Sequence, residues 1–154
     1  DEGYGVEEDD AEAFFWYQRA AEQGEAIAQA NLASKYADGE GVEADLKQAF
    51  HYFQLAANQG HADAQNRVGL MYDEGQGVAI DDEEAIRWYR RAAEQGLAVA
   101  FNNLGLMYEY GEGVDRDLNQ AVQYYQQAVE AGYGESASLL SSICSRRSAP
   151  PSCR

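Results

Sequence analysis

The sequence is poor in positive charge and in the residue types that most catalytic and metal sites use. Of its 154 residues, 11 are lysine or arginine and 27 are aspartate or glutamate, so the formal net charge is −16. Nucleic acids and anionic membrane surfaces require a basic binding face, and this balance argues against both as partners. The chain has two histidines, two cysteines and two prolines. It has no apolar run near the ~20 residues that span a membrane, so we expect no membrane insertion.

The few chemically active side chains do not form a catalytic or metal-binding pattern. His51 and His61 have no second histidine or cysteine at zinc-ligand spacing. The acidic segment 73–77 has glycine where a calcium loop needs oxygen ligands. The serines near the C-terminus, from Ser138 to Ser145, have no partner base in a glycine-rich elbow. We therefore expect no enzyme activity, no metal and no cofactor.

A Gly-x-Gly-Val tetrapeptide that returns every 36 positions is the main feature that is present. Its four copies begin at Gly3, Gly39, Gly75 and Gly111. A fixed period of this length indicates a stacked array of repeat units, each of which contacts mainly its neighbours. The tetrapeptide is not a phosphate-binding loop, because no Lys-Ser/Thr follows it and no strand pattern precedes it.

Each unit has the apolar spacing of two amphipathic helices. In the first helix an alanine stands three residues before an aromatic pair and another stands three residues after it. The four pairs are Trp16-Tyr17, Tyr52-Phe53, Trp88-Tyr89 and Tyr124-Tyr125. The second helix repeats at i, i+4 and i+8, as in Ala64, Val68 and Tyr72. The sequence predicts an all-α fold, an α/α solenoid of four 36-residue helix-turn-helix repeats with a C-terminal capping helix.

Signals for helix starts and ends recur in the same register. An aspartate followed three residues later by Glu or Gln matches a capping box at the start of each first helix. These aspartates are Asp9, Asp45, Asp81 and Asp117. A single glycine in the left-handed conformation is expected to end each first helix. These glycines are Gly24, Gly60, Gly96 and Gly132.

The combined pattern resembles the Sel-one-like repeat family, relatives of the tetratricopeptide repeats. Residues 64–96 contain nearly all of its string: Ala-x-x-x-Leu-Gly-x-x-Tyr (with Val68 for the Leu), Gly-x-Gly-Val, Asp, and Ala-x-x-Trp-Tyr-x-x-Ala-Ala-x-x-Gly. The resemblance implies a protein-binding adaptor, of a kind that is often bacterial and exported. It also implies a relation to immunity proteins that neutralise secreted phospholipase toxins, which some bacterial members resemble.

We expect residues 1–146 to form one repeat array and residues 147–154 to form a Pro/Ser-containing tail. The chain opens at a Gly-x-Gly-Val, midway through a unit. We therefore expect that a helix is missing before it and that the outer face of the first repeat is covered by something absent here. The last helix, at about residues 134–146, has serines in place of large residues, which suits a cap that faces water.

The two cysteines, Cys144 and Cys153, are predicted to form a disulfide that folds the tail back onto the last helix. They are two in number, nine residues apart and without a metal pattern. The alternative is two free thiols, one packed and one in the tail. A disulfide would imply the periplasm or an extracellular space, whereas free thiols would leave the cytoplasm open.

We predict that a partner binds the concave side of the solenoid, along the second helices. The residues expected to face it lie beside the packing positions and at the helix ends: Asn66, Leu70, Asp73, Glu74, Asn102, Leu106, Glu109 and Tyr110. Asparagine can bond an extended backbone through both its donor and its acceptor. Apolar anchors beside carboxylates suit a basic protein or peptide. The alternative for the two leucines is that they complete the packing between repeats.

Three functions compete at this stage. The first is a non-catalytic adaptor that works as a monomer. The second is an immunity or inhibitor protein that occludes a toxin enzyme, such as a phospholipase, with its acidic surface. The third is a hydrolase of the cell envelope, which would need a polar cluster with a poised base.

Overall fold

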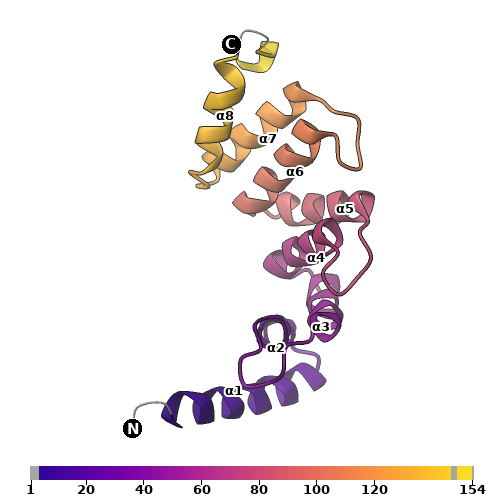
Figure 1. Ribbon diagram of the computed structural model, residues 1–154, viewed down its shortest axis with the longest axis vertical. Coiled ribbons are helices and arrows are strands. Elements are labelled where there is room, and N and C mark those ends of the chain that lie inside the picture. Colours follow the sequence, from indigo (N-terminus) through magenta and orange to yellow (C-terminus); the bar gives the residue numbers. More distant parts are fainter. Residues whose placement is uncertain (1–3, 147–148, 154) are drawn as a thin grey trace. The chain divides into compact units, whose positions relative to one another are not determined.

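The computed structural model describes residues 4–146 and 149–153, which form helices joined by short loops (Figure 1). No strand occurs in these residues. The helices are α1 (Tyr4–Glu22), α2 (Ala26–Asp38), α3 (Leu46–Asn58), α4 (Ala62–Glu74), α5 (Asp82–Glu94), α6 (Ala98–Tyr110), α7 (Leu118–Glu130), α8 (Ser136–Cys144) and the 3₁₀-helix η1 (Pro151–Cys153). The predicted all-α repeat solenoid is confirmed.

The chain forms two compact units, with the boundary between Ile80 and Asp81. In the N-terminal unit α1 packs on α2, α2 on α3 and α3 on α4. In the C-terminal unit α5 packs on α6, α6 on α7 and α7 on α8. Within each unit, every helix thus packs on the next one along the chain, as in a repeat array. The expected array of residues 1–146 is divided at the loop that precedes α5.

The local signals for helix ends act as predicted in three of the four repeats. The Asp45 side chain accepts hydrogen bonds from the backbone N–H groups of Lys47 and Gln48, at the start of α3. Asp81 accepts from the backbone N–H of Glu84 at the start of α5, and Asp117 accepts from those of Asn119 and Gln120 at the start of α7. The glycines that follow the first helices all have positive φ, between 81° and 100°. The aspartate side chains accept from backbone N–H groups that a helix start leaves unpaired, and the left-handed glycines allow the carbonyls at the helix end to be paired.

The first repeat departs from the prediction, because α1 already begins at Tyr4 and the segment expected to form a loop is helical. Asp9 therefore lies inside α1 and not at its start. At Gly77 and Gly113 the second glycine of the tetrapeptide lies against the start of the preceding first helix. A Cβ on Gly77 would stand 2.1 Å from the carbonyl oxygen of Leu46, the first residue of α3.

The repeated aromatic positions pack between neighbouring helices. Tyr36 of α2 stacks on Tyr52 of α3, with ring centroids 5.8 Å apart. Tyr108 of α6 stacks on Tyr124 of α7 at 5.5 Å. Gly105 of α6 allows close approach, because a Cβ there would lie 2.5 Å from a ring carbon of Tyr125. The small residues of the second helices thus make room for the large residues of the first helices.

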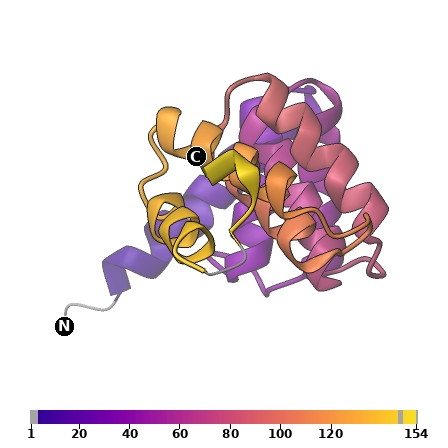
Figure 2. The same ribbon diagram turned by 90° about the horizontal axis from the view of Figure 1, so that it is seen from above.

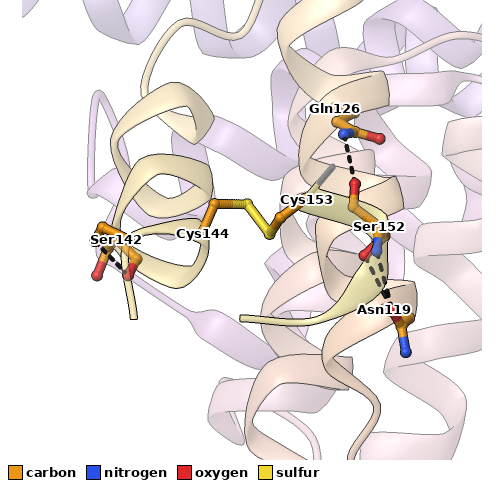
Figure 3. The surroundings of a disulfide bond; sticks show 7 residues. Asn119, Gln126, Ser142, Cys144, Ser152 and Cys153 are labelled. Atoms are coloured by element: carbon orange, nitrogen blue, oxygen red, sulfur yellow. Dashed lines mark hydrogen bonds between the residues drawn. A yellow bond between two sulfur atoms is a disulfide. The ribbon is translucent and has the colours of Figure 1, made fainter. Parts of the chain in front are cut away.

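The C-terminal tail folds back onto the last two helices. Cys144, at the end of α8, is joined to Cys153 of η1 by a disulfide (Figure 3). The η1 segment also packs against α7 (Figures 1 and 2). Here the Asn119 Oδ1 accepts from the backbone N–H of Ser152 at 3.3 Å and from its hydroxyl at 3.1 Å. The last α-helix is shorter than the predicted 134–146, since α8 spans Ser136–Cys144.

Reduction of the Cys144–Cys153 bond is expected to lower the stability of the C-terminal unit by about 2–3 kcal/mol, because the bond closes a short loop in the unfolded chain. The measurement is urea denaturation with and without reductant, next to a Cys144→Ser/Cys153→Ser protein that should not respond to reductant. Two thiols titrating per chain under denaturing, non-reducing conditions would contradict the bond.

Candidate partner-binding groove

The residues predicted to contact a partner lie on two helices in different units. Asn66, Leu70, Asp73 and Glu74 belong to α4 in the N-terminal unit. Asn102, Leu106, Glu109 and Tyr110 belong to α6 in the C-terminal unit.

The expectation that the two asparagines stand outside the packing between helices is wrong. Asn66 and Asn102 are only 8% and 7% exposed. The Asn102 Oδ1 accepts a 2.7 Å hydrogen bond from the hydroxyl of Ser136, a fully buried residue at the start of α8. The second helix of a repeat is covered on more than one side, so a position free in a single hairpin becomes buried in the array. Substituting Asn102 would therefore change the stability of the fold.

Glu109 is also a packing residue, and it is buried within the C-terminal unit. Its Oε2 accepts a 2.9 Å hydrogen bond from the hydroxyl of Tyr125, and its Oε1 lies 3.7 Å from the Arg146 guanidinium. Burial, together with the Glu109 carboxylate, raises the pKa of the Tyr125 hydroxyl well above its usual range. The hydroxyl therefore stays protonated and donates to Glu109, which links α6 to α7.

The other predicted residues are at least partly open to a partner. Glu74 and Tyr110 are exposed, and Leu70, Asp73 and Leu106 are half-buried. Leu106 packs on the core cluster of Ala121, Val122, Tyr125 and Ile143, so packing accounts for much of its contact. Glu74, in the N-terminal unit, and Tyr110, in the C-terminal unit, therefore remain predicted partner contacts.

A groove that the sequence analysis did not predict lies in the C-terminal unit. It has a volume of about 380 Å³ and is mostly apolar. Its lining comes from three helices: Arg90, Ala93 and Glu94 of α5, Phe101 and Leu104 of α6, and Tyr124 of α7. This volume lies within the range of known ligand pockets, about 300–1,000 Å³. We call it the α5 groove.

Arg90 supplies the α5 groove with a positive charge at a fixed place. Its Nη2 donates a 2.9 Å hydrogen bond to the Tyr108 hydroxyl, and Tyr108 stacks on Tyr124. A guanidinium has five N–H donors, so others remain for a ligand. Glu94 stands one helical turn further along α5 and brings a carboxylate to the same groove. The groove thus offers a donor and an acceptor beside an apolar surface.

A second, smaller hollow of about 180 Å³ adjoins the α5 groove through Arg90, which lines both. It lies between α5 and the loop that follows α6, and Gly113 and Val114 form its loop side. Arg87, which also lines it, is paired with Glu84.

Two residues of the α5 groove depart from the repeat pattern. The position of Arg90 is glutamine in the other three copies, at Gln18, Gln54 and Gln126. The position of Phe101 is glutamine in the first two copies, at Gln29 and Gln65. These two are buried side chains whose amides donate to the carbonyls of Ala21 and Ala57. The ring of Phe101 cannot donate this bond and leaves an apolar surface in the groove. Comparison of each copy with the other three was the sequence signal that could have found this site.

The lining of the α5 groove has no histidine, cysteine or serine, and its polar side chains are those of Arg90, Glu94 and Tyr124. Among the described residues, no group of three His, Cys, Asp or Glu side chains could hold a metal ion. None of the described helices combines the length and the apolar character that crossing a membrane requires.

The repeat pattern and this fold identify the class of protein. The model of the Sel1 repeat matches residues 1–25, 26–61, 62–97 and 98–133, and the chain belongs to this family. Proteins of the family are generally protein-interaction scaffolds. Curated proteins yielded no match.

Solved bacterial structures share the fold. A Sel1 repeat protein from Oxalobacter formigenes is 41% identical, with a TM-score of 0.84 over 93% of this chain. The protein c5321, a protective antigen of uropathogenic Escherichia coli with an SLR fold, is 38% identical, with a TM-score of 0.84 over 87% of this chain. The chain spans 58% of the first protein and 29% of the second. The immunity protein Pa5087 of Pseudomonas aeruginosa is 27% identical, with a TM-score of 0.50 over 91% of this chain and 65% of its own.

Proposed function

We propose that this protein is a non-catalytic interaction module that holds a segment of a partner protein in the α5 groove. The observation that carries the proposal is that Arg90 and Phe101, two departures from an otherwise regular repeat, line the same groove. The repeat fold does not require either residue, because the other three copies have glutamine at the Arg90 position and the first two copies have glutamine at the Phe101 position. A binding role accounts for both.

The lining residues favour a particular kind of ligand. An apolar side chain of the partner would lie against Phe101, Leu104 and Tyr124. A backbone carbonyl or a carboxylate beside that side chain would accept from Arg90, and an N–H or a lysine would donate to Glu94. This combination suits an extended peptide segment, which presents carbonyl and N–H groups beside each side chain.

The test replaces each unusual residue by the one that the repeat pattern prefers. Arg90→Gln is expected to keep the fold, because the other three copies have glutamine at this position. Phe101→Gln is expected to keep it as well, because Gln29 and Gln65 show that glutamine fits there and finds a carbonyl acceptor. Each should weaken binding of a captured partner by at least about tenfold, since truncation of a central contact costs about 2 kcal/mol. Leu55→Gln, on exposed α3 surface, is the matched control. If both groove variants melted normally and bound the partner with unchanged affinity, the α5 groove would not be the binding site.

The net charge of −16 favours a basic partner and should accelerate the encounter between the two proteins. Raising the salt concentration from about 0.05 to about 0.5 M shortens the screening length severalfold, so association should slow markedly. The dissociation rate should change much less, because contacts in the groove are short-range. Stopped-flow association at several salt concentrations measures both rates, and a salt-independent association rate would contradict the electrostatic part of the proposal.

An immunity or inhibitor role is the second candidate, supported by the similarity to the immunity protein Pa5087 and by the acidic charge. In that case the partner is a toxin enzyme whose activity falls when the two bind. We also propose a periplasmic or extracellular location, because a disulfide such as Cys144–Cys153 persists in an oxidising compartment. A genetic neighbour that encodes a secreted effector would favour the inhibitor over the general adaptor.

A further inference from the structure

Four charged residues form a stripe along one face of α5. Glu83, Arg87, Arg90 and Glu94 are spaced i, i+4, i+7 and i+11, so their side chains leave the same side of the helix. All four are exposed, and each lines at least one of the two hollows beside α5. No other first helix has four charges at the equivalent positions. Those positions hold Ala11, Phe15, Gln18 and Glu22; Lys47, His51, Gln54 and Asn58; and Asn119, Gln123, Gln126 and Glu130. We call these four residues of α5 the charged stripe.

The simplest role for the charged stripe would be ion pairing within α5, because residues four apart on a helix can pair. The structure shows other contacts. Arg87 is paired with Glu84, and Arg90 donates to a tyrosine hydroxyl of α6. Neither Glu83 nor Glu94 forms an ion pair within the described part of the chain. The two carboxylates and the remaining donors of Arg90 are therefore open to a ligand.

A ligand that fills the α5 groove has to bring a negative charge to Arg90. The groove beside Arg90 is lined by Phe101, Leu104 and Tyr124. A segment that covers these side chains also removes water from the guanidinium, and a charge that loses its water without gaining a partner is unfavourable. A carboxylate replaces the lost water, because it accepts from two guanidinium N–H groups at once. The charged stripe continues on both sides of Arg90, which favours an aspartate or glutamate within the ligand chain over a carboxylate at its end.

The order of charges along α5 sets the order along the ligand. From Glu83 through Arg90 to Glu94 the charged stripe reads acid, base, acid. Glu94 lies about 6 Å and Glu83 about 10 Å from Arg90 along the helix axis, at 1.5 Å per residue. An extended chain covers these lengths with about two and about three residues, respectively. The complementary segment therefore has an acidic residue between two basic ones.

We propose that the α5 groove selects an extended partner segment of the order base, acid, base, with the acid about two residues from one base and about three from the other. This inference rests on the proposed function and names the chemistry of the partner. The acidic side chain binds Arg90, the nearer base binds Glu94 and the farther base binds Glu83. Successive side chains of an extended chain point to opposite sides, so the residue between the acid and the nearer base should be apolar and face α6 and α7. Such a segment is basic overall, which agrees with the net charge of −16.

The experiment selects peptides from a phage-displayed random library on three full-length proteins. The first is the unchanged chain. The second, Arg90→Glu/Glu94→Arg, exchanges the two charges and keeps the net charge, and a carboxylate at position 90 can accept from the Tyr108 hydroxyl. The third, Gln54→Glu/Asn58→Arg, places the same pair at the equivalent positions of α3 and is the matched control. Thermal melting of each protein shows whether the fold is kept.

The unchanged chain and the α3 control should select the order base, acid, base. The Arg90→Glu/Glu94→Arg protein should select peptides in which the acid and the nearer base have changed places. A selected peptide and its version with these two residues exchanged have the same composition. Their affinities, measured by fluorescence anisotropy, should differ by about fivefold or more on the unchanged chain and in the opposite sense on the exchanged protein. If the exchanged protein melts early, Arg90→Gln gives the same test, and its peptides should lack the acidic residue.

Two kinds of result would contradict the proposal, and they can be told apart. Peptides that lose affinity for the Phe101→Gln protein, but show the same charge order in every selection, would overturn this inference and leave the α5 groove as a binding site. Peptides that bind the Phe101→Gln protein as tightly as the unchanged chain, or a selection that enriches no peptide, would overturn the proposed function together with the inference.

Discussion

Replacing Gly77 by alanine is expected to destabilise the N-terminal unit by about 3–5 kcal/mol, which is enough to unfold a marginal unit. Gly77 has a φ of +72°, and an added Cβ would lie 2.1 Å from the Leu46 carbonyl oxygen and 2.5 Å from its carbon. These atoms are backbone at the start of α3, so they cannot move aside without breaking the first turn. The loop after α4 would have to leave α3.

Gly60→Ala is the matched control for Gly77→Ala. Gly60 has a φ of +90°, but nothing lies within 4 Å of the Cβ that alanine would add. The Gly60→Ala variant should be destabilised only by about 1–2 kcal/mol, the energy needed to hold an alanine in the left-handed conformation. Urea denaturation followed by circular dichroism gives both values. If the two variants lost the same stability, the close packing of the second loop glycine on the preceding helix would be wrong.

Glu109→Ala is expected to lower the stability of the C-terminal unit by about 1–3 kcal/mol, because it leaves the buried Tyr125 hydroxyl without its acceptor. Glu109→Gln keeps an acceptor oxygen for the Tyr125 hydroxyl, so it should lose less stability than Glu109→Ala. The exposed residue Glu130 gives a control, since Glu130→Ala removes the same charge from the surface of α7.

A double-mutant cycle with Tyr125→Phe measures the coupling in the Glu109–Tyr125 pair. The double variant should lose less than the sum of the two single variants, because neither partner is then left alone. Additive losses would show that the hydrogen bond does not couple α6 to α7. Binding of a partner by a still-folded Glu109→Ala protein should change little, since this carboxylate is buried.

Local features of the fold were predictable because they depend on residues within one helical turn. Asp45, Asp81 and Asp117 cap helices through hydrogen bonds that span two or three residues. The left-handed glycines at 60 and 96 likewise act on their own helix ends. The 36-residue period repeats these helix-end signals, so the helices of the later repeats could be predicted from those of one repeat.

The predicted partner contacts failed where burial depends on distant residues. Asn102 is buried by Ser136, which is 34 positions further along the chain. Glu109 is buried by Tyr125 and lies near Arg146. The spacing of a single helix shows which positions pack on its nearest neighbour, but it does not show which remaining positions the following repeat covers.

The α5 groove was missed because the repeat pattern was treated as uniform. Arg90 and Phe101 belong to different helices, 11 positions apart, and only packing brings them to one groove. Each replaces a glutamine found in other copies. Positions at which one copy deviates from the shared repeat pattern are the positions to examine for a specific site.

The most direct test of the central claim is site-specific photo-crosslinking from the α5 groove. Benzoylphenylalanine replaces Phe101 in one protein and exposed Leu55 in another, and each is irradiated in an extract of the source organism. We predict that position 101 forms an adduct with a protein, that excess unmodified protein competes with this adduct, and that excess Phe101→Gln protein does not. Equal competition by both proteins, or an adduct from position 55 with none from position 101, would contradict a binding role for the groove.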